Sequence, residues 1–159
     1  MADKETIKVG DIAHEFTLKD QHKNEHNLRE MRGQKVLLSF HPLAWTGICA
    51  EQMKSLEAHM AEFHALGTVP LGVSVDSAPS KLAWGESLGI KDLRMLTDFW
   101  PHGGYAKELG LLREDAGTTN RANVIIDEDG KVEFVKVYDL GELPDIQEIL
   151  DHIREVREQ

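Results

Sequence analysis

Short apolar runs alternate along the chain with stretches whose apolar residues recur at helical spacing. The runs at 35–40 (KVLLSF), 69–76 (VPLGVSVD) and 93–98 (LRMLTD) are short and continuous, which predicts three buried strands. Two further segments, 16–31 and 122–139, each place a polar turn between β-prone runs and predict β-hairpins. The turn of the second hairpin reads Asp-Glu-Asp-Gly, a strong hairpin signal.

Helical periodicity fills the segments between these runs. From Thr46 onward, apolar residues are spaced three, four and three apart until Gly67 interrupts the pattern, so a single helix is predicted there. Shorter helices are predicted at 79–89, which opens with proline and closes with glycine, and at 103–110. The terminal segment 143–159 predicts an amphipathic helix. Its apolar stripe consists of Ile146, Ile149, Leu150, Ile153 and Val156.

The order of these elements indicates an α/β protein. Strand-helix-strand units favour parallel pairing, and the hairpins add antiparallel strands. We therefore expect a mixed sheet with helices on both faces and a hairpin near the N-terminus. A chain of 159 residues suits one domain, which we expect to span residues 1–159.

Composition narrows the function by exclusion. The formal net charge of -10, without a basic cluster, argues against nucleic acid or an anionic membrane as the main partner. The charged N-terminus contains no apolar core of a signal peptide, and no apolar run approaches the roughly 18 residues of a membrane span. With a single cysteine, no disulfide forms within the chain, so the cytoplasm is the expected location.

The single cysteine, Cys49, has two interpretations. It lies four residues before Met53 and continues the apolar stripe of the predicted helix, as a buried structural cysteine would. However, Thr46 is a good N-cap residue and would place Cys49 at the third helical position, where free backbone N–H groups and the helix dipole stabilise a thiolate. The segment also follows a buried strand, and open α/β sheets bind ligands at that edge.

A second chemical motif is weaker. His22-Lys23-Asn24-Glu25-His26 matches the H-x-x-E-H pattern of a class of zinc proteases, but that pattern requires a helix. The neighbouring Asp and Asn residues favour a turn, so we expect no metal site there. The sequence contains no phosphate-binding loop and no dinucleotide fingerprint, and no cofactor is expected.

The segment PLAWTGIC resembles the active-site pattern of the peroxiredoxins, thiol peroxidases of thioredoxin-like fold. In this chain the pattern is Pro42, three residues, Thr46, two residues and Cys49. The segment RANVIIDEDGKVEF is similar to the arginine-strand-hairpin segment of the family, and the likeness extends over about residues 7–138. The segments PLAWTGIC, DFWPHGG and AGTTNR most resemble the one-cysteine alkyl hydroperoxide reductase E group.

The resemblance implies roles for particular residues. Cys49 would be the nucleophile, Arg121 would stabilise the thiolate and the leaving oxygen, Thr46 would orient the peroxide, and Pro42 would shape and shield the pocket. From the residues alone, a surface ion pair is the favoured reading of Arg121, and Thr46 could serve as a helix cap alone.

Two further positions are assigned supporting roles. Gln52 stands where the family has Glu, Gln or His, three residues after the cysteine. His41 stands where most members have Tyr, and a hydrogen-bonded structural histidine is the favoured reading, with tuning of the sulfur as the alternative.

The implied activity is reduction of hydrogen peroxide, organic hydroperoxides or peroxynitrite through a Cys49 sulfenic acid. Without a second cysteine, the reductant would be an external thiol: a low-molecular-weight thiol, a glutaredoxin-like protein or a thioredoxin. With one cysteine in each chain, the other possibility is a disulfide between the Cys49 residues of two chains. The resemblance also implies a homodimer. Two rival functions are a non-enzymatic redox sensor and a binding or holdase module with an incidental cysteine.

Overall fold

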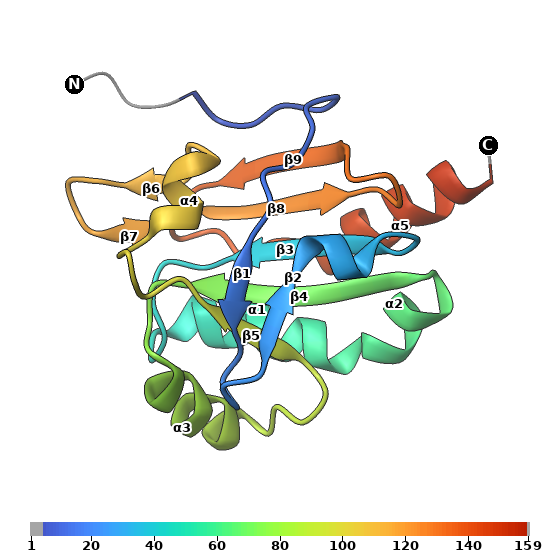
Figure 1. Cartoon of the computed structure of the whole chain (residues 1–159). Coiled ribbons are helices and arrows are strands. Elements are labelled where there is room, and N and C mark those ends of the chain that lie inside the picture. Colours follow the sequence, from blue (N-terminus) through green and yellow to red (C-terminus); the bar gives the residue numbers. More distant parts are fainter. Residues whose placement is uncertain (1–4, 159) are drawn as a thin grey trace.

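The fold is built on a seven-stranded mixed sheet, seen in a computed structural model that describes residues 5–158 (Figure 1). The strands lie in the order β2-β1-β5-β4-β3-β8-β9. Their bounds are β1 Thr17–Lys19, β2 Glu25–Asn27, β3 Lys35–Phe40, β4 Thr68–Ser74, β5 Arg94–Thr97, β8 Arg121–Ile126 and β9 Val132–Tyr138. A separate two-stranded sheet pairs β6 Leu112–Arg113 with β7 Thr118–Thr119.

The pairing confirms the expected mixture of parallel and antiparallel strands. Strand β4 runs parallel to both β3 and β5, because helices connect these strands across the sheet. Both predicted hairpins form: β1 pairs antiparallel with β2, and β8 with β9. The three predicted buried strands also form, although β4 and β5 end one or two residues earlier than the apolar runs suggest.

The single helix predicted between Thr46 and Gly67 is wrong in one respect, because it is interrupted at His59. The chain instead forms α1 (Gly47–Ala58) and α2 (Met60–Ala65). The ring nitrogen Nδ1 of His59 lies 2.8 Å from the Ser55 carbonyl oxygen, and the His59 N–H bonds the Leu56 carbonyl at 3.1 Å. In a regular helix the Ser55 carbonyl would accept a hydrogen bond from the His59 backbone N–H. The imidazole of His59 occupies this carbonyl instead, so the i→i−4 pattern is broken at this point.

The other predicted helices form with the caps that their sequences suggest. Helix α3 (Ala78–Leu88) carries proline in its first turn and ends at Gly89, whose φ of 75° is a left-handed conformation that glycine adopts easily. Helix α4 spans Gly104–Glu108. Helix α5 (Ile146–Arg157) begins where the Asp145 carboxylate accepts a hydrogen bond from the Gln147 N–H at 2.9 Å. Among the helices described, none is both long and apolar enough to cross a membrane.

Two hydrophobic cores cover the two faces of the sheet. One lies between the sheet and helices α1, α2, α3 and α5, and includes Leu37, Phe63, Trp84 and Ile149. The other lies under the N-terminal segment, the short 3-10 helix η1 (Leu28–Met31) and α4. All six residues of β3 are buried, because β3 lies inside the sheet between β4 and β8. Its amino and carboxyl ends lie on two opposite sides of the molecule.

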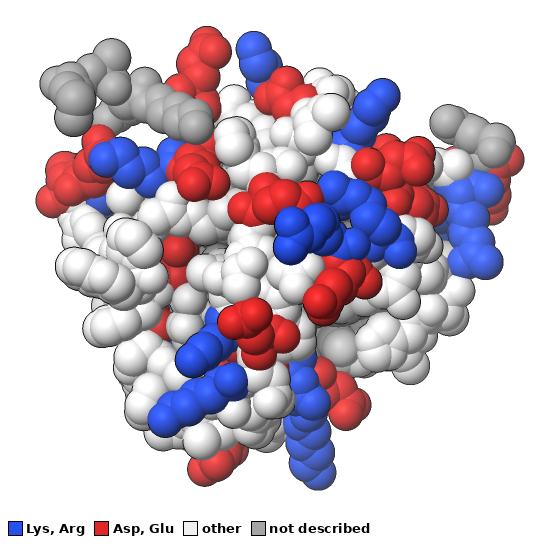
Figure 2. All heavy atoms as spheres, in the orientation of Figure 1, with Lys and Arg blue, Asp and Glu red and all other residues white. Residues whose placement is uncertain are grey.

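Charged side chains of both signs intermingle on one face of the molecule (Figure 2). A broad uncharged area lies at the left of the same view, on the side toward which the arrows of β3 and β4 point in Figure 1. This is the edge of the sheet that carries the carboxyl ends of its parallel strands.

Candidate active site

Cys49 lies at the third residue of α1, as the sequence predicts. Thr46 is the N-cap, with extended backbone angles, and its carbonyl accepts the first helical hydrogen bond from the Ala50 N–H at 2.9 Å. The side chain of Cys49 is almost fully buried, with 1% of its surface exposed. The sulfur therefore lies beside the free N–H groups of the first helical turn, in a setting that favours a negative charge.

The Thr46 hydroxyl makes a different contact from the one expected. It donates its proton to the Leu43 carbonyl at 2.8 Å, and no side-chain cap bond is formed. Because a hydroxyl has one proton and two lone pairs, Thr46 remains able to accept a hydrogen bond from a ligand. The side chain is exposed, so this acceptor is accessible from solvent.

Arg121 lies directly against the sulfur. It is the first residue of β8, and the neighbouring Ala122 pairs with Phe40 at the carboxyl end of β3. Its Nη1 is 3.4 Å from the Cys49 sulfur. Only 3% of Arg121 is exposed, so the structure does not place it in a surface ion pair.

Three further hydrogen bonds fix the plane of the Arg121 guanidinium. Nη1 donates to the Gln52 side-chain oxygen at 2.7 Å. On the other edge, Nε and Nη2 both donate to the Leu140 carbonyl, at 3.2 and 2.9 Å. With neutral acceptors on both sides, the guanidinium keeps its full positive charge for the sulfur and for whatever binds beside it.

Gln52 connects the central strand to the arginine. It follows Cys49 by three residues and so lies on the same face of α1. Its amide nitrogen donates to the Ser39 hydroxyl at 2.7 Å and to the Phe40 carbonyl at 3.1 Å, while its oxygen accepts from Arg121. Gln52 thus supports Arg121 without touching the space in front of the sulfur.

The loop between β3 and α1, residues 41–46, is held from the neighbouring elements. The Asp76 carboxylate accepts hydrogen bonds from the Ala44 N–H at 2.9 Å and from the Ser74 hydroxyl at 2.7 Å. Trp45 has a positive φ of 69°, and its indole N–H donates to the Ser80 hydroxyl at 3.0 Å. Pro42 is half-buried in this loop. Sequence reasoning did not single out Asp76, because its contact with Ala44 joins residues 32 positions apart in the chain.

His41 is fully buried and contacts Lys81, which sequence reasoning also missed. Its Nδ1 lies 3.3 Å from the Ser39 carbonyl, and its Nε2 contacts the Lys81 amine. Lys81 has no exposed surface, and its nitrogen lies 5.1 Å from the centre of the Trp84 ring. The available signal was that Lys81 precedes the buried Trp84 by three residues and so shares its face of α3.

Both groups of this pair have altered proton affinities. Burial lowers the pKa of Lys81 to about 7, and the negative charges at Asp76 and Cys49 act against that effect. Burial, followed by the positive charge of Lys81, holds the pKa of His41 well below its usual value. The imidazole is therefore neutral at pH 7, with its Nδ1–H directed at Ser39 and its Nε2 accepting from Lys81.

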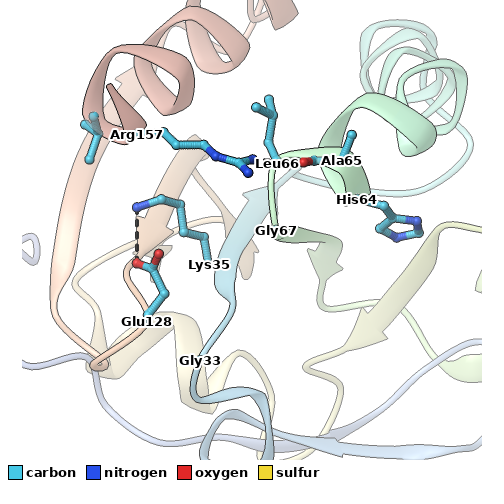
Figure 3. Close-up of a pocket in the computed structure, with 9 residues that line it drawn as sticks. Gly33, Lys35, His64, Ala65, Leu66, Gly67, Glu128 and Arg157 are labelled. Atoms are coloured by element: carbon cyan, nitrogen blue, oxygen red, sulfur yellow. Dashed lines mark hydrogen bonds and ion pairs between the residues drawn. The ribbon is translucent and has the colours of Figure 1, made fainter. Parts of the chain in front are cut away.

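The other candidate positions lie apart from this site. Residues 22–24 lie at the turn between β1 and β2, and Glu25 and His26 begin β2, where His26 Nε2 is 2.7 Å from the Asp20 carboxylate. Within residues 5–158 no group of three His, Cys, Asp or Glu side chains could hold a metal ion. A recess lined by Lys35, His64 and Arg157 lies at the opposite end of β3 from Cys49 (Figure 3).

Comparison with known proteins agrees with this geometry. Residues 9–135 match the model of the AhpC/TSA family. The chain is 38% identical over 140 residues to alkyl hydroperoxide reductase E of Mycobacterium tuberculosis, covering 87% of this chain and 91% of the relative. It is 33% identical over 133 residues to peroxiredoxin Bcp of Escherichia coli K12, covering 81% of this chain and 85% of the relative.

A solved structure gives the same result for the fold. The reduced 2-Cys peroxiredoxin of Plasmodium vivax superimposes with a TM-score of 0.86 at 30% identity, covering 94% of this chain and 82% of that one. The fold is therefore the expected thioredoxin-like α/β fold with a central mixed sheet. The chain belongs to the AhpC/TSA family of peroxiredoxins, and its single cysteine matches the one-cysteine type.

The geometry of Arg121 leads to a specific prediction for Arg121→Lys. A lysine keeps the charge but cannot donate to Cys49, Gln52 and Leu140 together, because it lacks the planar fork. We expect the second-order rate constant of the reduced protein with hydrogen peroxide to fall about a hundredfold, the usual effect of losing one oxyanion donor. Stopped-flow mixing measures this constant.

The surface variant Arg154→Lys serves as the matched control, since Arg154 contacts only exposed carboxylates on α2 and α5. It should react at the wild-type rate. A wild-type rate in Arg121→Lys as well would refute the assignment of Arg121 to the reacting site.

Proposed function

We propose that this protein is a thiol-dependent peroxidase that acts through Cys49. One observation supports the proposal most strongly: the buried Cys49 sulfur lies at the start of a helix, 3.4 Å from a guanidinium held by neutral partners. A lone structural cysteine has no need of a buried cation. The class of substrate is a peroxide, namely hydrogen peroxide, an organic hydroperoxide or peroxynitrite.

In the proposed step, the Cys49 thiolate attacks one peroxide oxygen in line with the O–O bond. A sulfur–oxygen bond forms, the O–O bond breaks, and the second oxygen leaves with the bonding electrons and takes a proton to give water or an alcohol. Arg121 stabilises the charge on the leaving oxygen, as an oxyanion donor does. The N–H groups at the start of α1 add to this effect.

Thr46 and Pro42 act on the peroxide and the pocket. The Thr46 hydroxyl, whose proton is committed to Leu43, accepts a hydrogen bond from the peroxide and so orients it. Pro42, which has no N–H, shapes the loop and limits water at the sulfur, which slows over-oxidation of the sulfenic acid. Gln52 is a supporting residue that fixes Arg121. His41 is a supporting residue at the end of β3, where it contacts Lys81.

The oxidised sulfur must be reduced by a thiol from outside the chain, because Cys49 is the only cysteine. An external thiolate attacks the sulfenic acid, releases water and forms a mixed disulfide, and a second thiol then frees Cys49. A low-molecular-weight thiol, a glutaredoxin-like protein and a thioredoxin each supply this chemistry. A supply of reduced thiols is typical of the cytoplasm, which is the location we propose.

We also propose that two copies of the chain associate through an apolar rim at the active-site edge. The rim consists of the large exposed side chains Leu43, Trp45, Phe99, Trp100, Leu140 and Leu143. They follow β3, β5 and β9, whose carboxyl ends lie at the same edge because β9 runs in the same direction as the parallel strands. This edge coincides with the uncharged area of Figure 2, and contiguous apolar patches of this kind mark protein interfaces.

The dimer proposal predicts the effect of Trp100→Glu. Trp100 is 81% exposed in the single chain, and a charge placed there would have to be buried on association. Light scattering should give about twice the mass of one chain for the wild type and a shift toward one chain for the variant. Val9→Glu, at a side chain 64% exposed outside the rim, should stay dimeric. A wild-type protein with the mass of one chain would contradict the proposal.

The assignment of Cys49 is tested by Cys49→Ser. The serine hydroxyl is nearly the same size but is not a thiolate nucleophile at neutral pH, so the variant should fold normally and consume no peroxide in the presence of dithiothreitol. The wild type should continue to turn over with the same reductant. A Cys49→Ser protein that retained most of the activity would show that another group reacts with peroxide.

A further inference from the structure

Lys81 is a buried amine that the proposed peroxidase mechanism leaves without a role. Its side chain is completely enclosed, which lysine accepts only where its charge is compensated. Within residues 5–158 the other buried lysine is Lys35, at the far end of β3. It is paired with the Glu128 carboxylate (Figure 3) and with that of Glu133. Lys81 is placed differently: its hydrogen-bond contact is His41 Nε2, a neutral acceptor, and the face of Trp84 lies beneath it. The charge of Lys81 must therefore be compensated by groups that do not bond it directly.

The compensating groups come from each element packed around the amine. His41 contacts it from the end of β3, and Trp84 beneath it packs in the same hydrophobic core as Cys49 at the start of α1. The charges of Asp76, after β4, and of Cys49 act on the amine through space. Arg121 approaches from β8 and acts on His41 from the other side. Of these groups, Asp76 and an ionised Cys49 carry negative charge, Lys81 and Arg121 carry positive charge, and His41 is neutral. When Lys81 is protonated, these charges balance only if the sulfur is a thiolate.

We propose that Lys81 is a positioning residue for Cys49: its ammonium group supplies a second positive charge, from the buried side of the site, that stabilises the thiolate. The same ammonium donates to His41 Nε2 and so fixes the imidazole at the end of β3. Arg121 acts where the peroxide binds, whereas Lys81 acts from a position that no peroxide reaches, since it has no exposed surface. This inference rests on the proposed role of Cys49 as the nucleophile.

The proton affinity of Lys81 agrees with this role. Burial lowers the pKa of Lys81 to about 7, and the charges of Asp76 and Cys49 oppose that shift. A thiolate at Cys49 thus helps Lys81 to hold its proton, and by reciprocity the ammonium helps Cys49 to stay ionised. A lysine with an ordinary pKa near 10.4 would be charged at neutral pH whatever the state of the sulfur, whereas the lowered pKa lets the protonation of Lys81 respond to the sulfur near pH 7.

The matched pair of variants is Lys81→Met and Lys35→Met. Each replaces a buried lysine by an uncharged side chain of similar length, but Lys35 lies at the other end of β3, roughly 17 Å along the strand at about 3.3 Å per residue. The first readout is the pH at which half of the thiol is ionised, followed by the ultraviolet absorbance of the thiolate. The second is the pH profile of the rate constant with hydrogen peroxide.

For Lys81→Met we expect half-ionisation to move to higher pH by about one unit or more, the usual effect of an opposite charge nearby. At acidic pH the rate constant should fall about tenfold, because only the thiolate reacts. At high pH, where the thiol is fully ionised, it should return to within about twofold of the wild type. Lys35→Met should leave both profiles in place. A Lys81→Met protein with the wild-type ionisation midpoint, or with a rate reduced equally at all pH values, would show that Lys81 only fills space.

A measurement on the unaltered chain keeps the test valid if Lys81→Met does not fold. Nuclear magnetic resonance of the lysine side-chain carbons should find one lysine that titrates near pH 7 in the reduced protein, well below the ordinary value of about 10.4. In Cys49→Ser that midpoint should move to lower pH, because the negative sulfur is gone. An absent low-pH lysine, or one that ignores the substitution, would overturn the inference.

These experiments distinguish a failure of the Lys81 inference from a failure of the proposed function. If Cys49→Ser continued to consume peroxide, the nucleophile assignment would fail, yet the ionisation of Cys49 in the wild type and in Lys81→Met would still be measurable without peroxide. If Cys49→Ser is inactive but Lys81→Met leaves the ionisation midpoint unchanged, the peroxidase assignment stands and the role of Lys81 falls.

Discussion

The contact between the Arg121 guanidinium and the Cys49 sulfur is the interaction on which the rest of the site depends. It joins residues 72 positions apart in the chain, and the antiparallel register of β3 and β8 brings them together. A shift of that register by one residue would turn Arg121 to the opposite face of the sheet, away from α1. The fold therefore specifies the chemistry through one strand pairing, and Gln52 and Leu140 fix the remaining freedom of the side chain.

Burial makes this contact effective and also makes it costly. Charges removed from water interact strongly, but each one must be compensated by neighbours. Cys49, Arg121 and Lys81 are all almost inaccessible, and Asp76 lies at the edge of the same group. The start of α1 adds fixed backbone dipoles that need no reorganisation when the sulfur ionises. The Arg121 guanidinium and the start of α1 thus both present positive charge to the Cys49 sulfur.

Much of the fold could be predicted from local patterns. The mainly apolar run of β3, the Asp-Glu-Asp-Gly turn between β8 and β9, and the glycine that ends α3 are signals contained in a few neighbouring residues. The position of Cys49 at the third residue of α1 was equally visible, because Thr46 marks the start of the helix. The break at His59 was not visible, since it depends on a side chain that binds the Ser55 carbonyl rather than on periodicity.

The residues that complete the site depend on tertiary contacts and were harder to find. The sequence alone left Arg121 as an ordinary arginine before a strand, and only its resemblance to a family motif marked it. Lys81 and Asp76 carried no such mark, because a lysine on a helix is normally solvated and an aspartate after a strand normally caps a turn. Their contacts with His41 and Ala44 exist only after three elements have packed together.

The central claim is that a single buried sulfur reacts with peroxide and depends on an outside thiol. Its most direct test is to mix the reduced protein rapidly with one equivalent of hydrogen peroxide and to record intact mass, a sulfenic-acid trap and a non-reducing gel. The account predicts one added oxygen on Cys49 in a chain that is not cross-linked, and two added oxygens with irreversible loss of activity in excess peroxide. A disulfide-linked dimer as the main product would contradict the external-thiol step, and consumption of peroxide without oxidation of Cys49 would contradict the whole account.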